Sequence, residues 1–237
     1  MNAERSLSIV IPAHNEAENI CATLDNVITA LAPLDIDYEI LAIDDGSSDR
    51  TSDLVRSYAA RYPRIRLLVN ERNMGFGWTF RRGVENATRS HIVMVHGDNA
   101  WGYATLRNLF ARTGEADIVI GYTTDMWRSR SFARTVVSRT FTIVVNGITR
   151  RHLNYYNGLQ IHDAAVLKSL RIQSSGYGFQ AEVLVKALRR SNSFIEVPMQ
   201  LTERAAGESK AFRMKNAVDV LRTLALLCRL EWGGAIE

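Results

Sequence analysis

The sequence predicts an α/β protein with a mostly parallel central sheet flanked by helices, and three observations carry that prediction. Short apolar runs alternate with helical periodicity through the first half of the 237-residue chain. The composition, 46% hydrophobic and 23% charged, is that of an ordinary globular protein. Polar clusters come directly after the apolar runs, where an open parallel sheet binds its ligands.

The expected elements follow one another as strand and helix. Strands are expected where aliphatic runs are short, at 7–11, 38–43, 65–69, 91–95 and 117–120. Helices are expected where apolar residues recur every three or four positions, at 17–31, 52–61, 78–87 and 105–112. Since strands joined through crossover helices lie parallel, this order predicts one sheet with both faces covered.

Charge divides the chain into two halves. Residues 1–125 carry 12 basic and 17 acidic side chains, whereas residues 126–237 carry 17 basic and 8 acidic ones. The interval 126–162 contains no Asp or Glu and holds six arginines, which favours binding to phosphates or to an anionic membrane surface. A solvated arginine-rich surface is the alternative. Nucleic acid is not expected as a partner, because the acidic half would repel a polyanion.

Hydropathy predicts a cytoplasmic protein attached peripherally to the cytoplasmic face of the membrane. No apolar run approaches the roughly 18 residues that cross a bilayer, and the N-terminus lacks the anatomy of a signal peptide. Apolar residues sit among arginines at 132–148 and again at 212–232. This pattern is typical of helices that lie in a membrane interface, although core packing or a second subunit in a homo-oligomer would produce it too.

Polar residues follow four of the expected strands. They are Ile-Pro-Ala-His-Asn-Glu at 11–16, Asp44 and Asp45, Asn73 with Gly75 and Gly77, and His96-Gly97-Asp98. Each cluster could be a local cap or turn. Gathered at one sheet edge, however, the carboxylates would repel one another unless a cation or hydrogen-bond donors offset their charge. The sequence therefore predicts a ligand site at this edge.

Four ordered segments resemble the successive motifs of glycosyltransferase family 2, whose members have the GT-A fold and use nucleotide sugars. The segments are IPAHNEAENI, AIDDGSSDRT, NMGFGWTFRRGVENA and IEVPMQLTERAAGESK. Within the family the chain is most similar to polyprenyl-phosphate sugar transferases of the dolichyl-phosphate mannosyltransferase type, through Arg204-x-x-Gly207-x-Ser209-Lys210 and the segment 178–186. The resemblance implies a GT-A catalytic domain at 1–210, with a nucleotide-sugar half at 1–125 and an acceptor half at 126–210, and a C-terminal helix at 211–237.

The resemblance also implies roles for individual residues on the donor side. The nucleotide sugar would be bound by Pro12, Ala13, Glu16, Asp44, Asp45, Asn73, Gly75, Asp98, Arg204, Ser209 and Lys210, of which Asp98, Arg204 and Lys210 would carry catalysis. The family's Asp-x-Asp motif, which holds Mg²⁺ or Mn²⁺, reads His96-Gly97-Asp98 here. His96 and Asp98 are therefore the expected metal ligands, with weakened affinity because neutral histidine does not offset the charge of the ion.

The implied reaction is an inverting transfer of a hexose from a GDP- or UDP-sugar to a polyprenyl phosphate. Acceptor binding is expected from Arg130, Arg134, Ser138, Arg139, Asn157, Gln160 and Glu182. A lipid phosphate is already anionic and needs no general base, whereas a saccharide hydroxyl would need one, for which Glu182 is the candidate. Transfer to a saccharide hydroxyl therefore stays open. So does a catalytically silent nucleotide-sugar-binding protein, because of His96.

Overall fold

The computed structural model describes residues 5–124, 132–174, 176, 178–200 and 214–232. In these residues one sheet contains the strands β1 (Ser6–Ala13), β2 (Asp37–Asp44), β3 (Ile65–Val69), β4 (His91–Met94), β5 (Ile118–Thr123), β6 (Gln160–Asp163) and β7 (Phe194–Met199). Their order across the sheet is β3-β2-β1-β4-β6-β5-β7. Neighbouring strands are parallel except in the two pairs that involve β6, which confirms the expected mostly parallel sheet.

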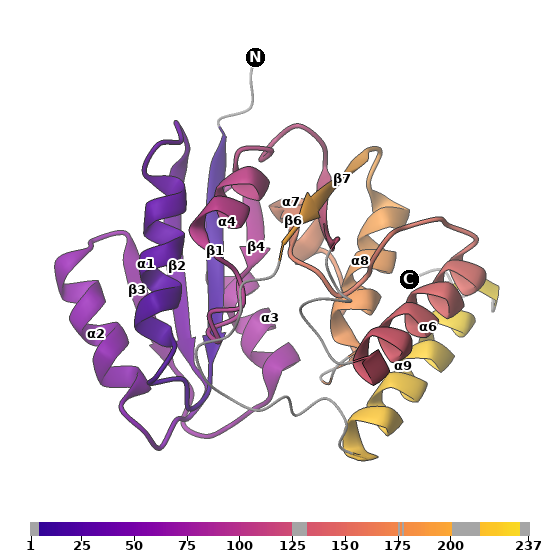
Figure 1. Cartoon of the computed structure of the whole chain (residues 1–237), viewed down its shortest axis with the longest axis horizontal. Coiled ribbons are helices and arrows are strands. Elements are labelled where there is room, and N and C mark those ends of the chain that lie inside the picture. Colours follow the sequence, from indigo (N-terminus) through magenta and orange to yellow (C-terminus); the bar gives the residue numbers. More distant parts are fainter. Residues whose placement is uncertain (1–4, 125–131, 175, 177, 201–213, 233–237) are drawn as a thin grey trace.

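Helices cover both faces of the sheet (Figure 1). One apolar cluster holds α1 (Ile20–Leu31), α2 (Thr51–Arg61) and α4 (Tyr103–Phe110), and another holds α3 (Phe76–Asn86), α7 (Ala164–Lys168) and α8 (Phe179–Arg190). The alternation along β1 joins the two, because Ile9 and Ile11 belong to the first cluster and Val10 to the second. Burial along its whole length is typical of a central strand in a parallel sheet.

The helices α6 (Phe132–Thr149) and α9 (Met214–Trp232) lie side by side at the end of the molecule opposite α2 (Figure 1). Both pack with α8 against Ile118 and Ile120 of β5 in a third apolar cluster. Among the helices that the structure describes, none has both the length and the hydropathy of a membrane span.

Two elements differ from the sequence expectation for identifiable reasons. Helix α1 begins at Ile20 rather than at residue 17, because Asn19 closes a turn by donating its amide to the carbonyl of Glu16 (2.9 Å). The side chain of Asp49 accepts the amide of Ala17 (3.0 Å) and holds this turn outside the helix. Strand β6 was not expected, because Ile161 is the single aliphatic residue among its four and the segment therefore forms no aliphatic run.

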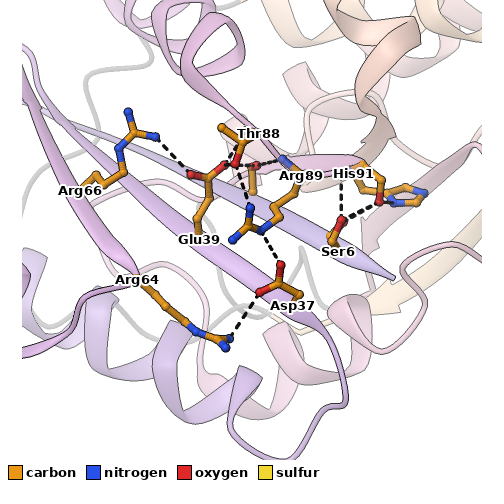
Figure 2. Close-up of polar contacts among 10 residues, drawn as sticks. Ser6, Asp37, Glu39, Arg64, Arg66, Thr88, Arg89 and His91 are labelled. Carbon is orange, nitrogen blue, oxygen red and sulfur yellow. Dashed lines mark hydrogen bonds and ion pairs between the residues drawn. The ribbon is translucent and has the colours of Figure 1, made fainter. Parts of the chain in front are cut away.

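The amino-terminal ends of the strands are joined by a polar network around the buried carboxylate of Glu39 (Figure 2). The carboxylate of Glu39 on β2 accepts hydrogen bonds from the Ser8 hydroxyl (2.8 Å) and the Thr88 amide (2.6 Å), and the Arg66 guanidinium lies 3.3 Å away. Arg89 pairs with Asp37 at the start of β2 (2.9 Å). These contacts tie β1, β2 and β3 together at the edge opposite the predicted site.

Candidate active site

The predicted donor residues that the structure describes lie at the carboxyl ends of β1, β2, β3 and β4 or in the loops that follow them. The chain runs outward from β1 through β2 to β3 and then returns to place β4 on the other side of β1. Ala13 is in register with Asp44, and Val10 is in register with Met94. An open α/β sheet typically binds its ligand where the strand order reverses, and in this sheet the loops after β1 and β4 lie at that place.

The loops after β1 and β2 are bound to each other. The His14 imidazole donates from Nδ1 to the carbonyl oxygen of Asp45 (2.9 Å), and the Ser48 amide donates to the side-chain oxygen of Asn15 (2.9 Å). Pro12 and Ala13 are buried, and Glu16 is half-buried. Because the two loops are hydrogen-bonded to each other, the backbone that carries Pro12, Ala13 and Glu16, the predicted nucleotide contacts at and after the end of β1, is held in place.

Asp44 and Asp45 are both buried, and backbone amides offset their charge. Asp44 Oδ1 accepts the Ser47 amide (3.0 Å). The two oxygens of Asp45 accept the amides of Met74 (2.9 Å) and Gly75 (3.0 Å), and Asn70 Nδ2 also donates to Oδ1 (2.7 Å). Asp45 therefore shapes the loop before α3. A hydrogen bond from either carboxylate to a nucleotide stays a prediction.

The loop that contains Asn73 and Gly75 passes directly over Gly46. A Cβ at Gly46 would lie 2.5 Å from the carbonyl carbon of Arg72, and φ is +64° at this position. Gly75 adopts φ +90°, and its amide donates a hydrogen bond to Asn73 Oδ1 (3.0 Å). Glycine permits both features, since it has no side chain and tolerates positive φ. The result is a short loop held close to the end of β2.

The loop after β4 carries His96 and Asp98 and is held from helix α1. The Thr23 hydroxyl donates to the carbonyl of Gly97 (3.0 Å) and accepts the amide of Asn99 (3.0 Å), while Asn26 Nδ2 donates to Asn99 Oδ1 (2.8 Å). Thr23 and Asn26 are not among the residues expected from the sequence. Their spacing of three places both on one helix face, but nothing in the sequence shows which loop that face meets.

The predicted metal ligands His96 and Asp98 are both half-buried in the loop after β4, and their role as ligands stays a prediction. Within the described ranges, no three His, Cys, Asp or Glu side chains lie close enough together to hold a metal ion. Mg²⁺ in transferases is usually held by one or two carboxylates together with substrate phosphates, and carboxylate oxygen suits Mg²⁺ and Mn²⁺ better than imidazole nitrogen does. The residues present therefore fit a metal that Asp98 shares with a bound diphosphate.

Several predicted residues lie outside the described part of the chain. Arg130, Arg204, Ser209 and Lys210 fall in the ranges 125–131 and 201–213, and Arg134 lies in α6 without a described side chain. Of the other acceptor candidates, Arg139 is exposed on α6, and the Ser138 hydroxyl donates to the hydroxyl of Tyr155 (3.3 Å).

Asn157 and Gln160 lie in and after the loop that leads into β6. Gln160 is buried, and both ends of its amide are bound: Nε2 donates to the carbonyl of Tyr156 (2.6 Å), and Oε1 accepts from His162 Nε2 (3.1 Å). Burial lowers the pKa of His162 to about 4, so its imidazole is neutral at pH 7. Asn157 Oδ1 is buried without a hydrogen-bond donor among the described residues. Gln160 thus shapes the loop, and a contact of Asn157 or Gln160 with an acceptor stays a prediction.

Glu182 is fully buried in α8 and is satisfied by the protein. It pairs with Lys186 (2.9 Å) and accepts the amides of Gln173 (2.8 Å) and Ser174 (2.6 Å). Burial raises the pKa of Glu182, but these hydrogen bonds outweigh burial and hold the pKa below its ordinary value. A carboxylate enclosed in this way does not offer a general base to an acceptor in this conformation.

Comparison with known proteins identifies similar sequences over most of the chain. The model of the family described as glycosyl transferase family 2 matches residues 8–170. A dolichyl-phosphate beta-glucosyltransferase of Dictyostelium discoideum is 28% identical over 219 residues, 83% of this chain and 66% of the relative. One from Trichomonas vaginalis is 28% identical over 94% of this chain and 74% of the relative. An undecaprenyl-phosphate mannosyltransferase of Micrococcus luteus is 27% identical over 85% of each chain.

Solved structures with a similar fold include glucosyl-3-phosphoglycerate synthase from Mycobacterium tuberculosis. Its complex with Mn²⁺, UDP-glucose and phosphoglyceric acid matches with a TM-score of 0.70 at 21% identity, over 94% of this chain and 80% of that one. Its complex with Mg²⁺ and UDP matches with a TM-score of 0.69 at 21% identity, over 94% and 79%. The likeness is one of fold, and it confirms the expected GT-A architecture.

Proposed function

This chain belongs to glycosyl transferase family 2, and from that membership we propose that it transfers one hexose from a nucleotide sugar to a polyprenyl phosphate. The chain is thus a glycosyltransferase, with GDP and UDP donors both open. The observation that supports the proposal is the position of the loop after β4, which contains Asp98 and follows a strand paired with β1 where the strand order reverses. The relatives that act on dolichyl and undecaprenyl phosphates support the choice of acceptor.

On the donor side, the loops after β1, β2 and β3 would enclose the nucleotide. Pro12, Ala13 and Glu16 would line one wall, and Asn73 and Gly75 would line the other. Their fixed backbones support this role, because a preformed site loses less entropy on binding. The predicted Arg204, Ser209 and Lys210 would add donors and positive charge for the diphosphate.

The divalent metal, when bound, would neutralise charge that develops on the leaving nucleoside diphosphate. Asp98 would hold it, with His96 as a weaker ligand. The remaining stabilisation would come from Arg204 and Lys210, since charge-assisted hydrogen bonds to phosphate are among the strongest that side chains make.

On the acceptor side, a lipid phosphate would attack the anomeric carbon without losing a proton first. No general base is needed for an anionic nucleophile, which agrees with the enclosed position of Glu182. The arginines 130, 134 and 139, with Ser138, would bind the acceptor phosphate. The buried Oδ1 of Asn157 would accept a hydrogen bond from a hydroxyl group of the sugar or of the lipid substrate.

Membrane contact is part of the proposal, and the outer faces of α6 and α9 support it. The exposed large apolar residues on these two helices are Phe132, Val136, Val137, Ile143, Val144, Val218, Leu221 and Trp232. Exposed arginines lie among them at positions 139, 222 and 229, and α6 contains no acidic residue. Apolar residues mixed with cations are typical of helices that dock on anionic lipid.

A transfer assay tests the proposal directly. Purified protein is incubated with Mn²⁺ or Mg²⁺, a short-chain polyprenyl phosphate and each of several GDP- and UDP-hexoses, and the lipid product is separated and identified by mass. We expect one donor to yield a hexosyl phospholipid. Turnover with a saccharide hydroxyl alone would identify a saccharide, not a lipid phosphate, as the acceptor. Nucleotide binding without turnover on either acceptor would indicate a nucleotide-sugar-binding protein that is not an enzyme.

A further inference from the structure

The loop before β6 lies at the sheet edge that carries the candidate site. Strand β6 is antiparallel to β4, with Ile161 in register with Val93, so the start of β6 meets the carboxyl end of β4. The carbonyl of Tyr156 in this loop accepts a hydrogen bond from Gln160 Nε2 (2.6 Å). Asn157 is the next residue along the chain, and its backbone therefore depends on the direction in which the Gln160 amide points.

Only one direction of the Gln160 amide suits this loop. In the opposite direction Oε1 would face the carbonyl oxygen of Tyr156, and both of these atoms are hydrogen-bond acceptors. At its other end the amide meets His162, whose Nε2 lies 3.1 Å from Gln160 Oε1. The two side chains lie on the same face of β6, because they are two residues apart on one strand, and they line the same small cavity.

His162 selects this direction, because its Nε2 carries the ring proton. The side chain is buried, and burial lowers its pKa to about 4, so the neutral ring holds a single proton at pH 7. Since Gln160 Oε1 can only accept, that proton belongs on Nε2. Nδ1 has no hydrogen-bond partner among the described residues, which agrees with this assignment, because a buried N–H there would lack an acceptor.

We infer that His162 is a positioning residue, whose Nε2–H fixes the Gln160 amide and thereby the loop that presents Asn157 to the substrate. The inference rests on the proposed function, in which Asn157 Oδ1 accepts a hydrogen bond from a substrate hydroxyl. His162 acts through Gln160 and touches no substrate in this role. Loss of the Nε2–H allows the Gln160 amide to turn, and the backbone next to Asn157 then loses its donor.

The test compares three variants of the whole chain. His162→Leu removes the donor, whereas His162→Gln keeps an N–H donor on a polar side chain. The matched control is His91→Leu, which removes another buried histidine at the start of β4, at the opposite edge of the sheet. Transfer to a short-chain polyprenyl phosphate is measured with the donor that wild type uses, and UDP and GDP binding is measured by calorimetry.

His162→Leu should lower kcat/KM for transfer about 3- to 10-fold, the effect of one lost hydrogen bond. Its affinity for UDP or GDP should stay within about 2-fold of wild type, since neither nucleotide carries the sugar or the lipid. His162→Gln and His91→Leu should keep kcat/KM within about 2-fold of wild type. Equal losses in His162→Leu and His91→Leu would indicate general destabilisation and overturn the inference.

A double-mutant cycle tests whether His162 acts through the loop. In an Asn157→Ala background, His162→Leu should cause no further loss of kcat/KM, because the side chain that the loop presents is gone. A further loss of the same size would overturn the inference. NMR of the ring nitrogens of His162 in wild type needs neither a substrate nor a variant. It should place the proton on Nε2 at pH 7, and a proton on Nδ1 would overturn the inference too.

Failure of the inference and failure of the proposed function give different results. If wild type forms the lipid product and His162→Leu forms it equally well, the positioning role is wrong and the transferase stands. If wild type forms no lipid product with any donor, the proposed function falls, and the role of His162 toward the substrate falls with it.

Discussion

Asp98 is the residue on which the proposed chemistry depends most. It supplies the carboxylate of the motif after β4, and its Oδ1 also accepts the amide of Ala100 (3.3 Å). Asp98→Asn should lower metal-dependent transfer by about 10²-fold or more, since a neutral amide replaces the charged ligand of the metal. Transfer rates measured across a Mn²⁺ titration check this expectation.

The control for Asp98 is Asp53→Asn, which neutralises an exposed carboxylate on α2 that pairs only with its neighbour Arg56 in the described contacts. Both variants should keep the wild-type circular dichroism spectrum. A wild-type rate of transfer by Asp98→Asn would show that Asp98 does not bind the metal.

Gly46 gives a second prediction at the scale of one residue. Gly46→Ala puts a Cβ 2.5 Å from the Arg72 backbone at φ +64°, so the loop with Asn73 and Gly75 has to move. The substitution should destabilise the protein by about 1–3 kcal/mol and weaken nucleotide binding, because strain at such a position has no flexible atom to relieve it. Urea denaturation and calorimetry measure the two effects.

Gly147 provides the opposite case for the same substitution. It lies inside α6 and a Cβ there would meet nothing within 4 Å. Gly147→Ala should therefore stabilise the protein by about 0.5–1 kcal/mol, the cost of glycine in a helix. Equal effects of the two substitutions would show that the close approach at Gly46 has no consequence.

At the scale of the elements, Glu39 links the amino ends of β1, β2 and β3 (Figure 2). Burial raises the pKa of Glu39, but hydrogen bonds from Thr88 and Ser8 and the charge of Arg89 outweigh burial and hold the pKa below its ordinary value of 4.5. A carboxylate with a depressed pKa contributes stability above its unfolded pKa and loses it as the pH falls through its folded pKa.

Glu39→Gln should therefore lower the free energy of unfolding by about 1–3 kcal/mol near neutral pH, since a hydrogen bond to a charged group is lost. The difference from wild type should shrink as the pH falls below 4.5. Urea unfolding of both proteins over this pH range measures the difference. A difference that stays constant with pH would show that the charge of Glu39 does not contribute.

At the scale of the whole molecule, the outer faces of α6 and α9 should decide membrane binding. Ile143→Gln combined with Leu221→Gln removes two side chains that are 69% and 65% exposed. Binding to anionic vesicles should fall about 10-fold or more, because a polar glutamine gains less free energy than an aliphatic side chain when it enters the membrane interface. Added salt should also weaken the binding of wild-type protein to these vesicles, since salt screens the charge of the arginines.

The matched control changes Val69 and Tyr103 to Gln, because these side chains are exposed at other places on the molecule. Vesicle sedimentation should show wild-type binding for this pair. Transfer to a short, water-soluble acceptor should be unchanged in both double variants. Equal vesicle binding by all three proteins would exclude α6 and α9 as the docking surface.

Strands β1 to β5, most helices and the sheet edge that carries the candidate site follow from local patterns in the sequence. Strand β1 is an aliphatic run buried on both faces, and a run of that kind can be recognised without knowledge of its neighbours. The placement of Asp44, Asp45 and Asp98 at one edge follows from the parallel order alone, because parallel strands end on the same side.

Contacts between distant segments determined which of these groups are available for chemistry. Asp44 and Asp45 look equivalent in the sequence, but in the fold both oxygens of Asp45 are bound by the loop before α3. In the sequence Glu182 is a candidate general base, but in the fold its carboxylate is bound by Lys186 and by the amides of residues 173 and 174. Local patterns report burial and periodicity within an element, whereas the partner of a polar side chain depends on loops whose course is decided by packing between elements.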